Sequence, residues 1–121
     1  MSKANNLKIA IDIRRKRIRL NQNVLDKIGD PEYVQLLVNP SSKKIVLLSS
    51  IETKNSHKIY GNHTRGYELT SLSLIRSLCT LCPEWTIENN YHIPGVFFER
   101  EQLIEFDMKQ AIPYKENGDS A

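Results

Sequence analysis

The hydrophobic and polar positions of the first half of the chain predict two hairpins. Residues 7–13 and 17–20 carry an apolar side chain at every second position, on either side of a basic turn. A period of two is typical of a strand with one buried face. Residues 33–38 and 44–49 are rich in apolar and β-branched side chains, and the segment Asn39-Pro-Ser-Ser that follows the first of them favours a turn.

A short helix is expected between these two hairpins. Val24, Leu25 and Ile28 follow the spacing of one helix face. Asn21 is a candidate N-cap, because its side chain can accept a hydrogen bond from the first turn, and Gly29 is a candidate stop. The first half therefore has the predicted order strand, strand, helix, strand, strand.

The second half repeats that order. Strands are expected in residues 57–60 and 66–69, a helix in residues 72–82, and a closing hairpin in residues 91–98 and 102–108. Ser71 or Ser73 is expected to cap this helix and Pro83 to end it, whereas Pro94-Gly95 inside a strand predicts a bulge or an edge. Corresponding segments are 49 residues apart in the first strand, 50 in the helix and 58 in the last two strands.

The expected fold is mainly β with two short helices. Two pseudo-symmetric ββαββ repeats, about residues 7–50 and 57–110, would bury their apolar faces against each other in one barrel. A chain of 121 residues, 40% hydrophobic and 26% charged, fits a single domain. It has no apolar run long enough for a bilayer and no secretory signal, so a cytoplasmic protein with reduced cysteines is expected. Residues 1–6 and 114–121 are expected to be flexible tails.

Charge is divided between the two halves. Residues 1–65 contain 13 Lys and Arg against 5 Asp and Glu, and residues 66–121 contain 4 against 9. A basic half favours polyanions through electrostatic attraction and counterion release. The densest cluster is Arg14-Arg-Lys-Arg17, followed by Arg19, in the expected turn of the first hairpin. A solvated hairpin whose charges serve solubility is the alternative.

The first half also resembles a known family. Residues 16–21 (Lys-Arg-Ile-Arg-Leu-Asn), the helix 24–29 (Val-Leu-Asp-Lys-Ile-Gly) and the hairpin 33–49 are similar to the AbrB-type swapped-hairpin module, and two such units in one chain resemble MraZ proteins (the SpoVT/AbrB/MraZ-like group). The resemblance implies a swapped-hairpin-like barrel and a bacterial transcription regulator or antitoxin that binds DNA as a homodimer. Asn21 stands where the family has a proline.

Two functions from different classes follow. The first is a DNA-binding regulator; the resemblance assigns phosphate contacts to residues of the first hairpin and helix, and the basic half adds further lysines: Arg14, Arg15, Lys16, Arg17, Arg19, Lys27, Lys43 and Lys44. The second is a phage or mobile-element inhibitor of a host protein such as a nuclease, for example an anti-CRISPR protein. In this case the acidic half would mimic nucleic acid through Glu99, Glu101, Glu105 and Asp107.

An enzyme is not expected, and neither is a cofactor or a metal. Cys79-Thr-Leu-Cys82 fits buried structural cysteines, a metal site or a redox pair, but a redox pair normally begins a helix and zinc needs about two more ligands. Glu105 and Asp107 share one strand face, which favours a solvated surface over paired acid–base carboxylates. The sequence has no glycine-rich phosphate loop or nucleophile elbow.

Overall fold

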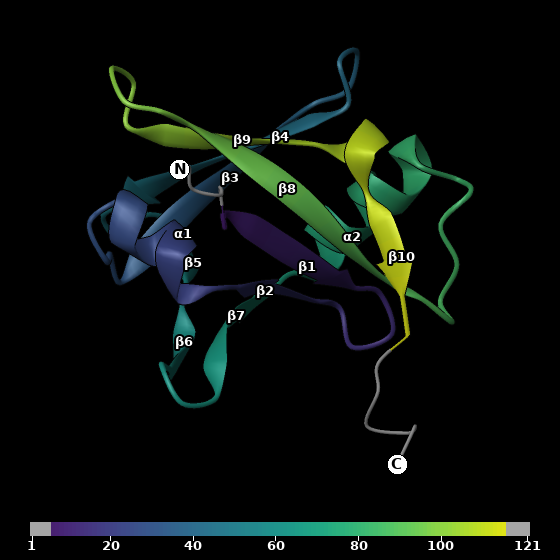
Figure 1. The fold of residues 1–121 in the computed structure, drawn as a ribbon, viewed down its shortest axis with the longest axis horizontal. Coiled ribbons are helices and arrows are strands. Elements are labelled where there is room, and N and C mark those ends of the chain that lie inside the picture. Colours follow the sequence, from purple (N-terminus) through teal and green to yellow (C-terminus); the bar gives the residue numbers. More distant parts are fainter. Residues whose placement is uncertain (1–5, 116–121) are drawn as a thin grey trace.

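The computed structural model describes residues 6–115, which form a mainly β fold with two helices (Figure 1). The first half contains β1 (Lys8–Asp12), β2 (Arg17–Leu20), α1 (Gln22–Lys27), β3 (Tyr33–Asn39) and β4 (Lys44–Ser50). The second contains β5 (His57–Lys58), β6 (Tyr60–Asn62), β7 (Gly66–Thr70), α2 (Leu72–Leu81), β8 (Asn90–Phe98), β9 (Leu103–Asp107), the 3₁₀ turn η1 (Met108–Gln110) and β10 (Ile112–Tyr114).

The strands form one sheet that nearly closes into a barrel. Their order is β5-β3-β4-β9-β8-β1-β2-β7-β6, and β10 lies beside β8. The two strands at the ends of this order, β5 and β6, are separated in the chain only by Ile59, so the backbone itself joins the two edges of the sheet. The expectation of a mainly β, barrel-like fold is confirmed.

The order of elements from β1 to β4 recurs from β6 to β9. In each half the first two strands form one hairpin and the last two form another. The halves meet where β2 pairs with β7, where β4 pairs with β9, where β1 pairs with β8, and where β3 pairs with β5. The recurring element order agrees with the sequence pattern, whereas a geometrical equivalence of the two halves stays a prediction.

A single core fills the barrel. Side chains at every second position of the strands point inward, as the alternation predicted: Ile9, Ile11, Ile18, Leu20, Val34, Leu36, Ile45, Leu47, Leu69, Ile93, Ile104 and Phe106 are all buried. Each helix adds one apolar face, which comprises Val24, Leu25 and Ile28 from the α1 segment and Leu74, Ile75 and Leu78 from α2. The structure therefore places both halves around the same interior.

Both helices begin at the expected caps. The Asn21 side chain accepts a hydrogen bond from the backbone N–H of Val24 (3.0 Å), and the Ser71 hydroxyl accepts one from Leu74 (3.2 Å). Gly29 follows α1 with a φ of +90°, a conformation that favours glycine and stops the helix. Within residues 6–115, neither helix has the length and apolar character required to cross a bilayer.

Three details differ from the expected elements. The second helix has ten residues and is therefore not short. Met108 begins a 3₁₀ turn instead of ending a strand, because the Asp107 carboxylate accepts a hydrogen bond from the backbone N–H of Lys109 (3.0 Å). Tyr114, expected to begin the C-terminal tail, ends strand β10 and stacks on His92 at 3.9 Å between ring centroids. Residues 1–5 and 116–121 of the expected tails lie outside the described residues.

Strand β8 changes partners at Pro94-Gly95, where a bulge or an edge was expected. Residues 90–94 pair with β1 and residues 95–98 pair with β9. The backbone N–H of Gly95 donates a hydrogen bond to the carbonyl of Leu7 (2.8 Å), which joins the end of the first pairing to the start of the second. This long strand thus passes from one side of the barrel to the other (Figure 1).

Candidate nucleic-acid interface

The β1–β2 hairpin carries most of the basic residues that the sequence analysis singled out. Residues 7–20 contain six basic residues and one acidic residue. Arg14, Arg15 and Lys16 occupy the turn and are exposed, as expected. Lys16 has a φ of +56°, and its N–H donates a hydrogen bond to the carbonyl of Ile13 (3.2 Å), which closes the turn. The turn therefore presents three neighbouring cationic side chains to solvent.

Asp12 holds this turn in place from beneath. Its carboxylate is 1% exposed and accepts hydrogen bonds from the backbone N–H and Nη1 of Arg15 (both 3.2 Å) and from Nε of Arg17 (2.9 Å). Burial by itself would raise the pKa of Asp12, but these hydrogen bonds and the charge of Arg17 outweigh it and lower the pKa below its ordinary value. The ionised carboxylate thus organises the cationic turn.

Arg17 bridges two carboxylates on the outer face of the barrel. Besides its bond to Asp12, its Nη1 donates to Oε1 of Glu68 on β7 (3.0 Å), and only 17% of its side chain is exposed. A guanidinium that is half-buried between two acids has most of its charge compensated. The structure therefore gives Arg17 a role in holding β2 against β7.

Arg19 lies further along the same outer face. Its Nη2 donates a hydrogen bond to the backbone carbonyl of Arg65 in the β6–β7 turn (2.7 Å). In the sheet register it is opposite Ala10 of β1, which in turn is opposite His92 of β8. Because neighbours in register share a face of the sheet, Arg19 and His92 lie on either side of the small Ala10 side chain.

The remaining predicted basic residues lie elsewhere. Lys27 is the last residue of α1, and its Nζ lies 5.2 Å from the ring centroid of Phe97. Lys43 and Lys44 lie at the β3–β4 turn, where Lys44 forms an ion pair with Glu105 (3.3 Å). Figure 1 shows that turn at the upper right, well apart from the β1–β2 turn at the lower right. The structure therefore gathers Arg14 to Arg19 but not the three lysines.

The four acidic residues of the alternative site are divided in the same way. Glu99 and Glu101 are exposed in the β8–β9 turn. Glu105 pairs with Lys44, and Asp107 pairs with Lys109 (3.2 Å). Burial would raise the pKa of Asp107, but hydrogen bonds from Lys109 and the nearby lysine charges lower it overall. Of these four residues, Glu99 and Glu101 are thus the two whose carboxylates form no ion pair with another described residue.

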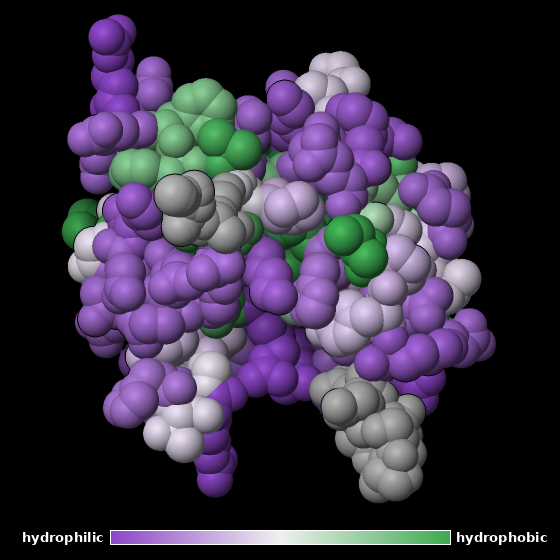
Figure 2. Space-filling view, viewed as in Figure 1, coloured by the Kyte–Doolittle hydropathy of each residue, from purple (hydrophilic) through white to green (hydrophobic). Residues whose placement is uncertain are grey.

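An exposed apolar patch on the outer face of β3, β4, β9 and β8 was not identified from the sequence. Leu37, Val96 and Phe98 are 54%, 57% and 39% exposed. Figure 2 shows hydrophobic side chains gathered over the end of β8 and β9, at the upper left of this view. Consecutive apolar residues such as Leu36 and Leu37 could have indicated this patch. Neighbours in a strand point to opposite faces, so one residue of such a pair must lie on the outer face.

Cys79 and Cys82 lie at the end of α2. Cys82 is buried with its Sγ 3.9 Å from Sδ of Met108, whereas Cys79 is half-buried. Burial raises the pKa of both thiols, so neither is activated as a thiolate. In the part of the chain that the structure describes, no three His, Cys, Asp or Glu side chains lie close enough together to hold a metal ion.

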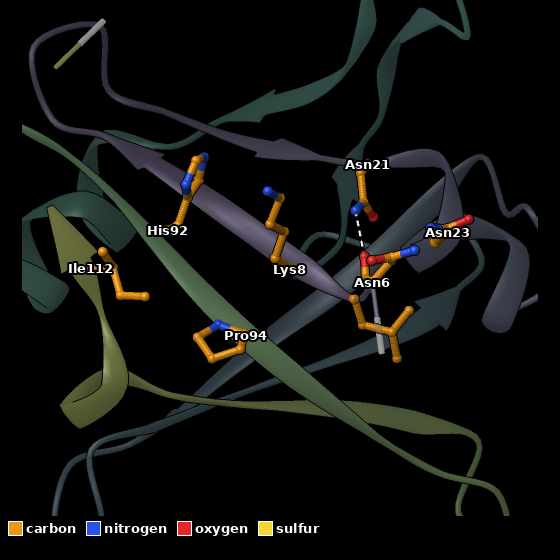
Figure 3. A pocket seen from close by; sticks show the side chains of 8 residues that line it. Asn6, Lys8, Asn21, Asn23, His92, Pro94 and Ile112 are labelled. Carbon is orange, nitrogen blue, oxygen red and sulfur yellow. Dashed lines mark hydrogen bonds between the residues drawn. The ribbon is translucent and has the colours of Figure 1, made fainter. Parts of the chain in front are cut away.

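A hollow on the outer face of β1 was also missed by the sequence analysis (Figure 3). It measures about 470 Å³ and adjoins a second hollow of about 260 Å³ that shares Lys8, Asn21 and His92. In Figure 3 the side chains of Lys8 and His92 rise next to each other from β1 and β8. The pKa of His92 is lowered by burial and by the charge of Lys8, which favours the neutral imidazole at neutral pH.

No protein-family model matches the chain, and neither a curated protein nor a solved structure shows significant similarity to it. The resemblance to the AbrB-type module therefore stays a prediction.

Proposed function

We propose that this protein is a DNA-binding regulator whose β1–β2 hairpin lies along the phosphate backbone. The observation that supports this function best is the cationic turn, in which Arg14, Arg15 and Lys16 are exposed side by side. Exposed Lys and Arg side chains bind duplex DNA chiefly by displacing condensed counterions from phosphates. Such contacts position a protein on DNA without reading its bases.

The buried anchor beneath the turn is a second argument. A solubility device needs no fixed geometry, yet Asp12 binds both the backbone and the side chain of Arg15. Ordering a side chain before binding lowers the entropy that is lost on association. The ordered residue is Arg15, but its charge is already paired with Asp12. We therefore expect its exposed neighbours Arg14 and Lys16 to gain most from phosphate contact.

The double variant Arg14→Gln/Lys16→Gln tests the proposal and leaves both partners of Asp12 intact. We expect its affinity for a random 20-base-pair duplex to fall at least tenfold at low salt. The slope of log K against log salt concentration should become shallower by about 2, since each lost phosphate contact removes about 0.9 from it. Fluorescence anisotropy over a salt series measures both quantities.

The matched control is Lys54→Gln/Arg76→Gln, which removes the same net charge from two exposed positions outside the hairpin. Its salt slope should stay close to that of the unmodified protein. Equal losses of DNA affinity in the two double variants would show that binding depends on net charge alone. Unchanged affinity in Arg14→Gln/Lys16→Gln would contradict the proposal.

An inhibitor of a host nuclease is the second proposal, and the apolar patch favours it. Contiguous exposed apolar residues mark protein–protein contacts more often than DNA contacts. Here Val96 and Phe98 lie directly before the exposed acidic turn that contains Glu99 and Glu101. An apolar anchor with an acidic rim is complementary to the basic groove of an enzyme that binds nucleic acid.

Charge reversal at the turn, Glu99→Lys/Glu101→Lys, tests this second function. We expect the tagged protein to retain a nucleic-acid enzyme from host lysate and the variant to lose it, because like charges across an interface repel. Glu84→Lys/Glu88→Lys, at two exposed positions on another loop, is the matched control. Retention of the same enzyme by all three proteins, measured by quantitative mass spectrometry, would contradict an acidic contact.

A further inference from the structure

The smaller of the two adjoining hollows on β1 exists because a small residue stands in a row of large ones. Ala10 is paired with Arg19 on one side and with His92 on the other. All three side chains belong to the outer face, so the methyl group of Ala10 leaves space between a guanidinium and an imidazole. Lys8 stands on the same face two residues away and extends this space toward the start of α1.

The two sides of the hollow differ in character. On one side, the ring of Tyr114 stacks on His92 at an interplanar angle of 18° beside the smaller hollow, and Pro94 and Ile112 add apolar surface in the larger one. The other side offers the amide side chains of the lining residues Asn6, Asn21 and Asn23. The Asn21 amide donates a hydrogen bond to the backbone carbonyl of Asn6 (2.6 Å), as Figure 3 shows. Planar apolar surface and hydrogen-bonding groups therefore face the same space.

The electrostatic character of the hollow favours an anion. Lys8 lines both hollows and Arg19 lines the smaller one, and no Asp or Glu is among the described residues that form their walls. Arg19 is held by its hydrogen bond to the Arg65 carbonyl, which uses one of the five N–H donors of the guanidinium. Its remaining donors can thus bind a phosphate oxygen with little loss of side-chain entropy.

We propose that this hollow binds a nucleoside phosphate, with the phosphate between Lys8 and Arg19 and the base against the His92–Tyr114 pair. Flat unsaturated bases stack on aromatic side chains whatever their sequence. Arg19 and Tyr114 line the smaller hollow of about 260 Å³, and the adjoining hollow of about 470 Å³ lies within the range of about 300–1,000 Å³ typical of small-ligand sites. The ligand is either a free nucleotide or an unpaired nucleotide of a strand, and the site needs none of the three turn residues.

Isothermal titration calorimetry with AMP, adenosine and inorganic phosphate tests the site. We expect AMP to bind at least tenfold more tightly than either fragment, because only AMP uses both sides of the hollow. Lys8→Gln should weaken AMP binding about tenfold through the loss of a charge-assisted contact. Ala10→Leu keeps every charge but fills the floor, and should abolish binding. Arg14→Gln, which removes a charge from the same hairpin outside the hollow, should leave AMP affinity within twofold.

The outcomes separate this site from the DNA interface. AMP binding that survives in Arg14→Gln/Lys16→Gln while duplex binding falls shows two independent sites. A 5′-phosphorylated single-stranded trinucleotide that binds more tightly than AMP assigns the ligand to a strand, and the reverse order assigns it to a free nucleotide. Absence of AMP binding, equal affinity for phosphate alone, or undiminished binding in folded Ala10→Leu would overturn the proposal, whatever the result with duplex DNA.

Discussion

Replacing Asp12 with alanine is expected to lower the free energy of unfolding by about 3 kcal/mol, the range in which breaking a buried ion pair falls. Asp12 is 1% exposed and is the shared partner of Arg15 and Arg17. Its removal deprives the Arg17 guanidinium, whose side chain is only 17% exposed, of the carboxylate that lies 2.9 Å from its Nε. It also removes the acceptor of the hydrogen bond that the backbone N–H of Arg15 donates in the turn.

Urea unfolding of three variants separates the contributions. Asp12→Asn keeps the shape and one acceptor oxygen but removes the charge. Its free energy of unfolding should therefore lie between that of the unmodified protein and that of Asp12→Ala. Asp26→Ala is the control, because Asp26 is exposed on α1 and accepts a hydrogen bond from Gln22 only one turn away (2.8 Å). Its cost should stay within about 0.5 kcal/mol, as for most surface substitutions. Similar losses at Asp12 and Asp26 would contradict the anchoring role.

Acid sensitivity provides an independent readout of the same carboxylate. The pKa of Asp12 is lower in the folded protein than its ordinary value of 3.8. Its ionised form therefore stabilises the fold above that value, and this contribution is lost as the pH falls through the folded-state pKa. Asp12→Asn should show a flatter dependence of stability on pH below 4 than the unmodified protein, with the remaining slope due to other groups such as Asp107. A parallel dependence in both proteins would show that Asp12 does not contribute.

Gly95→Ala is expected to cost about 2–3 kcal/mol, the upper part of the range for overpacking a core. A Cβ at this position would lie 2.5 Å from Cε2 of Phe106 and 2.8 Å from Cγ2 of Ile104. Both side chains are fully buried on the neighbouring strand β9, so neither can move into solvent to make room. The backbone cannot shift freely either, because the Gly95 N–H is bonded to the Leu7 carbonyl.

Two further variants identify the cause of this loss. Gly29→Ala introduces a Cβ with nothing within 4 Å but at a φ of +90°, so it measures backbone strain without a clash, about 1 kcal/mol. Phe106→Leu in the Gly95→Ala background should recover part of the loss relative to the sum of the single variants, since it removes the atoms that clash. Strict additivity in that double-mutant cycle, measured by thermal or urea unfolding, would rule out the steric explanation.

The elements of this fold could be predicted from local signals. The alternation from Leu7 onward, the cap at Asn21 and the stop at Gly29 each act within a few residues of the position they determine. The structure confirms β1, β2 and α1 because those signals agree with burial in the barrel. Strand β10 was not found, since Ile112 to Tyr114 has no alternation of its own and is a strand only because β8 offers a free edge beside it.

The site was predicted less completely than the fold. The exposed turn residues Arg14 to Lys16 were recognisable from charge density, which needs no partner. Glu68 lies 51 residues from Arg17 in the chain and compensates its charge only because β2 pairs with β7. The nucleotide hollow likewise brings together Lys8, Arg19 and His92 from three strands, and in the sequence each is an isolated residue.

By itself, the sequence determined where the helices and all strands but the short edge strand β10 form, where they turn, and that the first hairpin is strongly basic. Each of these properties arises from side chains close together in the chain, through hydrogen bonds to the nearby backbone and the period of apolar positions. Only the tertiary structure decided which charges remain available and where the surface is hollow. Both depend on strand register, since pairing places Asp12 under Arg17 and Ala10 between Arg19 and His92.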